Sequence, residues 1–350
     1  VTRNHEEDDI EYSVLELFHG PTAAFKDFGA RFLSSTMFEL VKNDRRAITT
    51  ILVATSGDTG GAVASAFHNK DGFKVVILFP KGGVSPRQKH QLTCWDNNII
   101  SLEVEGEFDD CQRLVKEAFN DSKLSEAHNL CSANSINIGR LLPQATYYAW
   151  TALSRYKTHR ELSSFIIPSG NLGNAFACFI AREMGFPIHQ IVSSTNSNKT
   201  LTDFVSTGKW TPTKTIRTVA SAMDVGNPSN MERFFSQYPD KNELLRNFEA
   251  YSVNDTEIRK EILSVFRRTS TIICPHTATA FSAFRSLPLS TRIHSHWVLV
   301  STAHPAKFEN IVEPIIDTAI EIPKSLEDIL HKPTSYHTIG KELENLIPYL

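Results

Sequence analysis

Short runs of β-branched and aliphatic residues alternate along the chain with stretches of helical periodicity. The apolar runs predict buried strands at Ile51–Ala54, Val75–Phe79, Ile99–Val104, Phe165–Ile167 and Val298–Val300. The periodic stretches between them predict helices, among them Gln112–Phe119, Leu142–Ser154 and Ala175–Met184. Strands that alternate with helices are typical of βαβ units, so we expect an α/β fold with a mostly parallel sheet covered on both faces.

The chain length sets the expected domain organisation. With 350 residues, the chain is long enough for two domains, each with its own core. We interpret the charged segment Tyr156–Leu162 as a linker between two α/β units. This predicts domains at residues 1–160 and 161–330, followed by a C-terminal tail at 331–350. The tail after Pro323 is expected to form peripheral helix.

Composition and charge argue against several classes of function. The formal net charge is −3, both signs are mixed along the chain and no polybasic run occurs, so the sequence indicates neither nucleic-acid binding nor an anionic membrane surface. The five cysteines are scattered and never spaced as CxxC, which argues against a disulfide framework or structural zinc site and favours a reducing, cytoplasmic compartment. No apolar run approaches the roughly 18 residues that a membrane span needs.

Two junctions between a strand and a helix carry glycine-bearing polar loops. The first reads ILVAT-SGDTGG-AVASAF over residues 51–67, and the second reads FIIPS-GNLGN-AFACFIA over residues 165–181. Glycine lets a backbone approach a ligand closely, and the free N–H groups at a helix start favour an anion. Neither loop reads GxGxxG or is followed by GKS or GKT, so a dinucleotide fingerprint and a P-loop are both excluded. The alternative is a pair of tight turns without a ligand.

A lysine stands at the start of a predicted amphipathic helix in HGPTAAFKDFGARFL, residues 19–33. Phe25, Phe28, Phe32 and Leu33 are spaced for one helix face, and Lys26 lies between large apolar neighbours. An isolated lysine in such a helix is usually a solvated surface residue. The functional interpretation is a lysine whose pKa is lowered by desolvation and by the helix N-terminus, because a neutral amine forms a Schiff base with an aldehyde cofactor.

Three further segments carry polar side chains. The stretch CSANSINIGR, residues 131–140, is either a loop with helix-capping Ser and Asn or a phosphate clamp built from an amide and a guanidinium. VSTAHPAKF follows a predicted strand with Thr302 and His304, and CPHTATA carries His276. His294 and His296 lack a third ligand nearby in the sequence, so we expect no metal site.

Five motifs together resemble the threonine synthase family, in the branch found in enterobacteria and fungi. They are HGPTAAFKDFGARFL, ATSGDTGGAVA, NSINIGR, PSGNLGN and STAHPAKF, which occur in the family's order and span residues 14 to about 310. The resemblance implies the fold-type II architecture of pyridoxal-phosphate enzymes, as in the tryptophan synthase β chain. In that architecture two α/β domains flank a cleft that holds pyridoxal 5'-phosphate.

The resemblance also implies roles for individual residues. Lys26 matches the lysine that binds the cofactor covalently, and Thr302 matches the residue near the pyridine nitrogen. A hydroxyl at that place leaves the ring closer to neutral than a carboxylate would. The cofactor-phosphate cup is expected at Gly170, Asn171, Leu172, Gly173 and Asn174. Substrate contacts are expected from Ser56, Gly57, Asp58 and Thr59 on the carboxylate, and from Asn134 and Arg140 on the phosphate.

The implied reaction converts O-phosphohomoserine and water to threonine and phosphate. Asp58 stands where relatives outside the family usually have Asn, and we expect it to bond to backbone N–H groups and to shape its loop. One competing function is a serine or threonine dehydratase on the same fold, but a dehydratase has no use for the clamp of Asn134 and Arg140. The other is a non-enzymatic module that binds a phosphorylated ligand.

Departures from the family pattern are few. Leu172 stands where the branch often has Phe, and Asn174 where some members have Asp. Family members carry a further N-terminal segment before the motif at residue 14, and the chain is expected to lack it. The sequence does not distinguish a monomer from a dimer.

Overall fold

The structure is a computed structural model that describes residues 2–7, 10–42 and 48–350. It divides into two compact units, each built from segments that are distant in the sequence. The lysine unit comprises Gly20–Arg140 and Ile322–Leu350, and the cup unit comprises Val1–His19 and Leu141–Glu321. Within the described residues, no helix combines the length and the apolar character needed to cross a membrane.

The lysine unit is built on a parallel sheet. Its strands, in the order in which they lie in the sheet, are β11 (His337–Ile339), β5 (Ile99–Val104), β4 (Phe73–Pro80), β3 (Thr49–Ala54) and β6 (Leu130–Ser132). Its helices are α1 (Lys26–Val41), α2 (Asp58–Phe67), α3 (Pro86–Thr93), α4 (Phe108–Asn120), α5 (Ser122–Ala127), α6 (Ile138–Leu141), α16 (Lys324–Leu330) and α17 (Leu343–Leu346), with a 3₁₀ turn at Ile347–Tyr349.

Both faces of this sheet are buried, as the near-continuous apolar strands predicted. Successive side chains of a strand point to opposite faces, so alternate residues belong to different cores. Ile51 and Val53 of β3 pack with residues of α1, α2 and α3. Leu52 and Ala54 pack with residues of α4 and with Leu346 of α17. The two cores fix the sheet on both sides, which holds the loops at its carboxyl edge.

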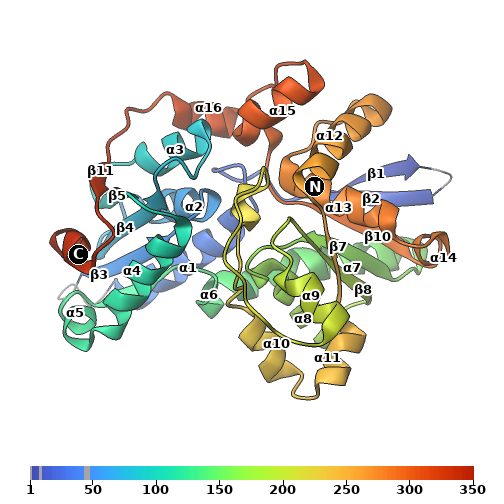
Figure 1. Ribbon diagram of the computed structural model, residues 1–350, viewed down its shortest axis with the longest axis horizontal. Coiled ribbons are helices and arrows are strands. Elements are labelled where there is room, and N and C mark those ends of the chain that lie inside the picture. The colour runs from blue at the N-terminus through green and yellow to red at the C-terminus, as the bar shows by residue number, and fades with distance from the viewer. Residues whose placement is uncertain (1, 8–9, 43–47) are drawn as a thin grey trace. The chain divides into compact units, whose positions relative to one another are not determined.

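The cup unit contains a mixed sheet in which β1 is antiparallel to β2. The order is β1 (Thr2–Glu7), β2 (Ile10–Glu16), β10 (His296–Ser301), β7 (Ser163–Pro168), β8 (Ile188–Thr195) and β9 (Glu249–Ser252), with parallel pairing from β2 to β9. Figure 1 shows β2 and β10 side by side although they come from opposite ends of the chain.

The helices of the cup unit follow its strands. They are α7 (Ala145–His159), α8 (Gly173–Glu183), α9 (Thr200–Thr207), α10 (Met231–Gln237), α11 (Lys241–Asn247), α12 (Asp255–Thr269), α13 (Pro275–Ser286), α14 (Leu289–Arg292) and α15 (Glu309–Ile316), with 3₁₀ turns at Leu142–Gln144, Ser221–Met223 and Pro305–Phe308. Helix α13 contacts β7, β8 and β10, and α8 contacts β7 and β8.

The expected α/β architecture is confirmed, and each predicted strand lies within an observed one. The units differ from the expected domains 1–160 and 161–330, because β2 pairs with β10 and places the N-terminal strands in the cup unit. The segment Tyr156–Leu162 lies inside the cup unit, where α7 continues to His159. The tail is more than peripheral helix, since β11 extends the sheet of the lysine unit.

Candidate active site

Lys26 is the first residue of α1, as predicted. The preceding turn is held by Asp27, whose carboxylate accepts hydrogen bonds from the Thr22 backbone N–H (2.9 Å) and hydroxyl (2.7 Å). A Cβ on Gly20 would lie 2.3 Å from that carboxylate, so the turn requires glycine there. The Lys26 side chain is 16% exposed and its Nζ lies 5.0 Å from the centroid of the Phe25 ring.

The apolar face predicted for this helix is only partly correct. Leu33 is buried, whereas Phe28 and Phe32 are 43% and 47% exposed. The buried side of α1 instead carries the small residues Gly29 and Ala30, which allow close approach. A Cβ on Gly29 would lie 2.1 Å from the carbonyl oxygen of Arg140, so backbone packing rather than a phenylalanine face sets the position of this helix.

Asp58 lies next to Lys26 in the lysine unit. It is the first residue of α2, directly after the loop that follows β3. One carboxylate oxygen, Oδ2, is 4.0 Å from Lys26 Nζ, and the other, Oδ1, accepts a hydrogen bond from Gln88 Nε2 at 2.9 Å. The Lys26 amine and the Asp58 carboxylate therefore lie within ion-pair distance, with side chains that are 16% and 4% exposed.

Backbone bonds to Thr55 shape the loop that contains Ser56 and Gly57. The Thr55 hydroxyl accepts hydrogen bonds from the backbone N–H groups of Gly57 (3.0 Å) and Gly60 (2.9 Å). Gly57 has a φ of 129°, and a Cβ there would lie 2.5 Å from Gln88 Nε2. Ser56 in this loop and Thr59 in the first turn of α2 are half-buried. The conformation therefore depends on glycine and on the neighbouring Gln88.

Gln88, which no sequence motif indicated for the site, is also part of the edge that carries Asp58. Its Oε1 accepts a hydrogen bond from the backbone N–H of Ser85 at 3.1 Å, while the Ser85 hydroxyl accepts one from the Gln88 N–H. These reciprocal bonds form a capping box at the start of α3. The sequence SPRQ indicates such a cap. Nothing in it indicates that the Gln88 side chain also contacts Asp58.

Asn134 and Arg140 follow β6, the strand beside β3. Asn134 donates a hydrogen bond from Nδ2 to the carbonyl oxygen of Ala54, the last residue of β3, at 2.8 Å. Arg140 is 2% exposed, donates to the carbonyl oxygen of Ala133 and is attracted by Asp27. Burial lowers the pKa of Arg140 to about 10, which leaves it cationic at neutral pH. Lys26, Asp58, Asn134 and Arg140 are thus parts of one connected edge of the lysine unit.

The cup loop follows β7 and leads into α8. Leu172 precedes the helix in the left-handed conformation, with a φ of 61°, which is uncommon for a non-glycine residue. Asn174 lies in the first turn and is 6% exposed. Its Oδ1 accepts hydrogen bonds from the hydroxyls of Tyr147 and Tyr148, the second at 2.9 Å. Burial raises the pKa of both tyrosines, which keeps them as donors.

The remaining amide group of Asn174 indicates a ligand. Among the described residues no hydrogen-bond partner exists for its buried Nδ2. A buried N–H donor without a partner is costly, and here it stands in the first turn of an 11-residue helix whose N-terminus favours an anion. These features fit the phosphate group of pyridoxal phosphate. Tyr147 and Tyr148, which orient the amide, were not predicted because they lie on α7, far from the glycine loop in sequence.

Thr302 lies at the same edge of the cup unit as this loop. It follows β10, which pairs with β7, and it is 5% exposed. His304, two residues later, accepts a hydrogen bond through Nδ1 from the backbone N–H of Ala306 at 3.2 Å. Burial lowers the pKa of His304 to about 4, so its imidazole is neutral near pH 7. His276 accepts from the N–H of Ala222 at 3.1 Å, which gives it a structural contact.

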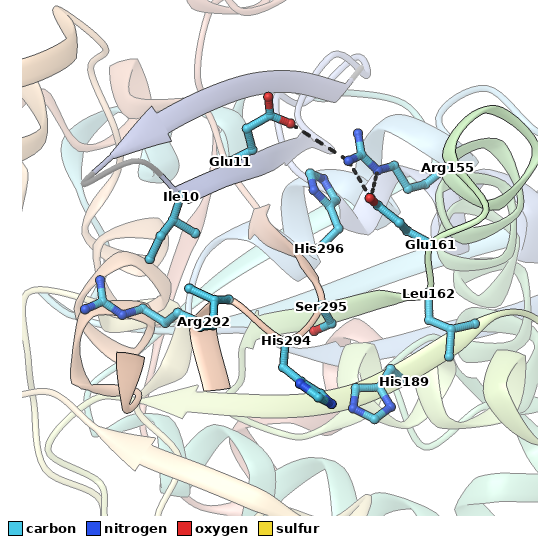
Figure 2. Close-up of a pocket in the computed structure, with 11 residues that line it drawn as sticks. Ile10, Glu11, Arg155, Glu161, Leu162, His189, Arg292, His294, Ser295 and His296 are labelled. Carbon is cyan, nitrogen blue, oxygen red and sulfur yellow. Dashed lines mark hydrogen bonds and ion pairs between the residues drawn. The ribbon is translucent and has the colours of Figure 1, made fainter. Parts of the chain in front are cut away.

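A separate pocket of about 470 Å³ lies at the opposite, amino-terminal edge of the cup-unit sheet. Figure 2 shows His189 and His294 near each other there, while Arg155 pairs with Glu161. None of the predicted site residues lines this pocket. Across the described residues, no three His, Cys, Asp or Glu side chains are placed to bind a metal ion.

Comparisons with known proteins identify the family. The model of the pyridoxal-phosphate dependent enzyme family matches residues 4–303, and that of the threonine synthase C-terminal region matches 277–348. Threonine synthase of Buchnera aphidicola (subspecies Schizaphis graminum) is 41% identical over 340 residues, which are 97% of this chain and 77% of the relative. Threonine synthase of Escherichia coli is 38% identical over 97% of this chain and 77% of its own.

Solved structures agree with these matches. The crystal structure of Escherichia coli threonine synthase has a TM-score of 0.89 at 36% identity, over 99% of this chain and 79% of that one. The threonine synthase of Brucella melitensis with bound pyridoxal phosphate gives 0.87 at 34% identity, over the same shares of the two chains. The motif order, the two sheets and these matches agree, and the chain belongs to the threonine synthase family of pyridoxal-phosphate-dependent enzymes.

Proposed function

We propose that this chain converts O-phosphohomoserine and water to threonine and inorganic phosphate, with pyridoxal phosphate attached to Lys26. The observation that carries the proposal is the convergence of three motifs in the lysine unit. Lys26 Nζ lies 4.0 Å from Asp58, and Asn134 bonds to the end of β3, from which the Asp58 loop emerges. The Lys26 amine, the loop of Asp58 and the Asn134 amide thus lie at one edge of the lysine unit. A phosphorylated amino acid requires these three kinds of group together.

The cup unit would hold the phosphate group of the cofactor. Gly170, Asn171, Leu172, Gly173 and Asn174 form the loop and first turn whose N–H groups suit a phosphate. Thr302 would stand near the ring nitrogen, where a hydroxyl leaves the ring closer to neutral than a carboxylate would. When bound, the cofactor withdraws electrons from the substrate carbon that loses its proton.

Residues of the lysine unit would carry out the proton transfers and the charge stabilisation. The Lys26 amine removes the proton at Cα of the substrate and then transfers protons at Cβ and Cγ. The loop of Ser56, Gly57, Asp58 and Thr59 holds the substrate carboxylate through its N–H groups and hydroxyls, while the Asp58 side chain shapes the loop. Asn134 and Arg140 stabilise the charge on the phosphate as it leaves Cγ, after which water adds at Cβ.

The competing dehydratase has no role for a phosphate clamp. The buried, cationic Arg140 and the position of Asn134 beside the end of β3 support a phosphorylated substrate over serine or threonine. We also propose a cytoplasmic location, supported by five free cysteines in the described structure.

The decisive experiment mixes the purified chain with pyridoxal phosphate and O-phosphohomoserine, then measures threonine and phosphate together. Equal amounts of both products are expected. Lys26→Ala should abolish turnover, whereas Lys81→Ala should not, since Lys81 is an exposed lysine of the same unit paired with Glu105. A dehydratase would instead release ammonia from serine or threonine, and a binding module would give no product. Steady turnover by Lys26→Ala would refute the role of this lysine.

A further inference from the structure

The cup is packed against a second segment of the same unit. A Cβ on Gly170 would lie 2.7 Å from Met223 Cα, so the backbone of Met223 lies directly against the first glycine of the cup. Asn171 is held as well: its Oδ1 accepts hydrogen bonds from the N–H of Ser229 (2.6 Å) and from the Ser229 hydroxyl (3.0 Å). The segment 218–230, here called the support segment, therefore contacts the cup at two successive residues.

A buried carboxylate fixes this support segment. Asp224 is 7% exposed, and its Oδ1 accepts hydrogen bonds from Asn196 Nδ2 and from the Thr218 hydroxyl, both at 2.7 Å. Its Oδ2 accepts a bond from the backbone N–H of Thr218 at 3.0 Å. Burial raises the pKa of Asp224 to about 7, and the bonds from Thr218 and Asn196 oppose that rise by favouring the ionised form.

Asn196 connects the carboxylate to the sheet. It follows directly after β8, the strand that pairs with β7, and it is completely buried. Besides Asp224, its Nδ2 contacts the carbonyl oxygen of Ala220 at 3.2 Å. The chain of contacts thus runs from the end of β8 through Asp224 to Met223 and from there to Gly170.

We propose that Asp224 is a positioning residue for the cofactor phosphate, acting through Met223 on the shape of the cup. The inference rests on the proposed function, because it assigns the cup to that phosphate. With Asp224 ionised, its two oxygens receive the donors from Thr218 and Asn196, and the backbone at residue 223 stays against Gly170. An amide at position 224 has one acceptor oxygen and presents its N–H₂ group to donors, so the support segment moves and the cup N–H groups lose their alignment.

The test compares Asp224→Asn with Glu261→Gln. Glu261 is a buried carboxylate on α12 of the same unit, and it pairs with Arg285 on α13. The apo forms are titrated with pyridoxal phosphate to obtain dissociation constants, and the phosphorus NMR resonance of the bound cofactor is recorded. In Asp224→Asn the dissociation constant should rise about tenfold or more and the resonance should shift, as is typical when the support of a ligand-binding group is lost. Glu261→Gln should change neither the dissociation constant nor the resonance, even if it lowers the melting temperature as much as Asp224→Asn does.

Other outcomes contradict the inference. Unchanged affinity and an unchanged resonance in a folded Asp224→Asn would overturn it, as would an equal loss of affinity in Glu261→Gln. If Asp224→Asn does not fold, Thr218→Val, which removes only the hydroxyl, should weaken cofactor binding to a smaller extent; normal affinity would then refute the proposal. If the unsubstituted chain binds no pyridoxal phosphate, the proposed function itself is contradicted. If it binds the cofactor and Asp224→Asn binds it equally well, only the role given to Asp224 is refuted.

Discussion

Asn134 donates a hydrogen bond from its side-chain amide to the carbonyl oxygen of Ala54 across 2.8 Å. This contact ties the segment after β6 to the end of β3, so the motif expected to hold the substrate phosphate lies beside the loop expected to hold its carboxylate. One side chain thus fixes the position of the segment after β6 relative to the loop that follows β3.

Replacing Asn134 by Ala should raise the KM for O-phosphohomoserine about tenfold, because one hydrogen bond to a charged group is lost. The affinity for pyridoxal phosphate should not change, since Asn134 is not among the residues assigned to the cofactor. Steady-state kinetics and a cofactor titration measure the two quantities. Asn137→Ala is the control for loop structure, because Asn137 donates to the Ser132 carbonyl oxygen within the same loop. Equal effects of both substitutions on KM would show that Asn134 only maintains the loop.

Removing Gln88 should affect the reaction through Asp58. Gln88→Ala deletes the donor at 2.9 Å from the Asp58 carboxylate, and we expect kcat/KM to fall about tenfold. A double-mutant cycle with Asp58→Asn measures the link between the two residues. Strong non-additivity, of about 1 kcal/mol or more, is expected because they contact each other directly. Strictly additive losses would mean that Gln88 acts only by capping α3.

Replacing Tyr148 by Phe should weaken the binding of pyridoxal phosphate. The substitution removes one of two hydroxyls that hold the Asn174 oxygen, so the free amide N–H group would be less well oriented. We expect the dissociation constant to rise a few-fold, about 1 kcal/mol. The more exposed Tyr156 lies on the same helix, so Tyr156→Phe is the matched control. A cofactor affinity that is the same in both variants would contradict the role given to Tyr148.

The stability of the chain should depend on His296 in acid. Burial lowers the pKa of this imidazole to about 4, from 6.5 in an exposed side chain. The folded state then binds fewer protons than the unfolded state between these values, so the free energy of unfolding falls as the pH drops from 6.5 towards 4. The loss attributable to one such group is at most roughly 3 kcal/mol.

Urea unfolding of the unsubstituted chain and of His296→Gln, across pH 4 to 7.5, measures this contribution. Glutamine keeps a polar group opposite the Ser13 hydroxyl, which lies 2.7 Å from His296 Nε2. The difference between the two curves should change within the predicted window and be flat above it. A difference that is constant with pH would show that His296 does not titrate in this range.

Local patterns in the sequence predicted much of the fold and the candidate site. The apolar runs located β3, β4, β5, β7 and β10, and the glycine loops located the two strand–helix junctions proposed to bind ligands, because both signals are contained in a few consecutive residues. Contacts between distant segments could not be predicted in this way. Tyr147 and Gln88 reach the site from other helices, and the pairing of β2 with β10 has no local signature.

The same limit explains why the contact between the support segment and the cup was not predicted. Nothing in the residues of this segment indicates that Met223 packs against Gly170. Similarly, the spacing of Phe28 and Phe32 indicated a buried helix face, whereas the close approach at Gly29 determines how α1 is packed. A pattern of residue types thus predicts elements better than it predicts which small residue allows two backbones to touch.

The pairing of β2 with β10 has a consequence for how the protein is made. The side chains of Ser13 and His296 contact each other across this pair, although the two residues are 283 positions apart in the sequence. During synthesis the N-terminal strand must therefore wait for most of the chain to leave the ribosome before its sheet can close, since contacts at such a separation form late. The strands β3, β4 and β5 are close together in sequence and can assemble much earlier. The edge that carries Lys26 is thus expected to begin folding while the cup unit still lacks its central strand.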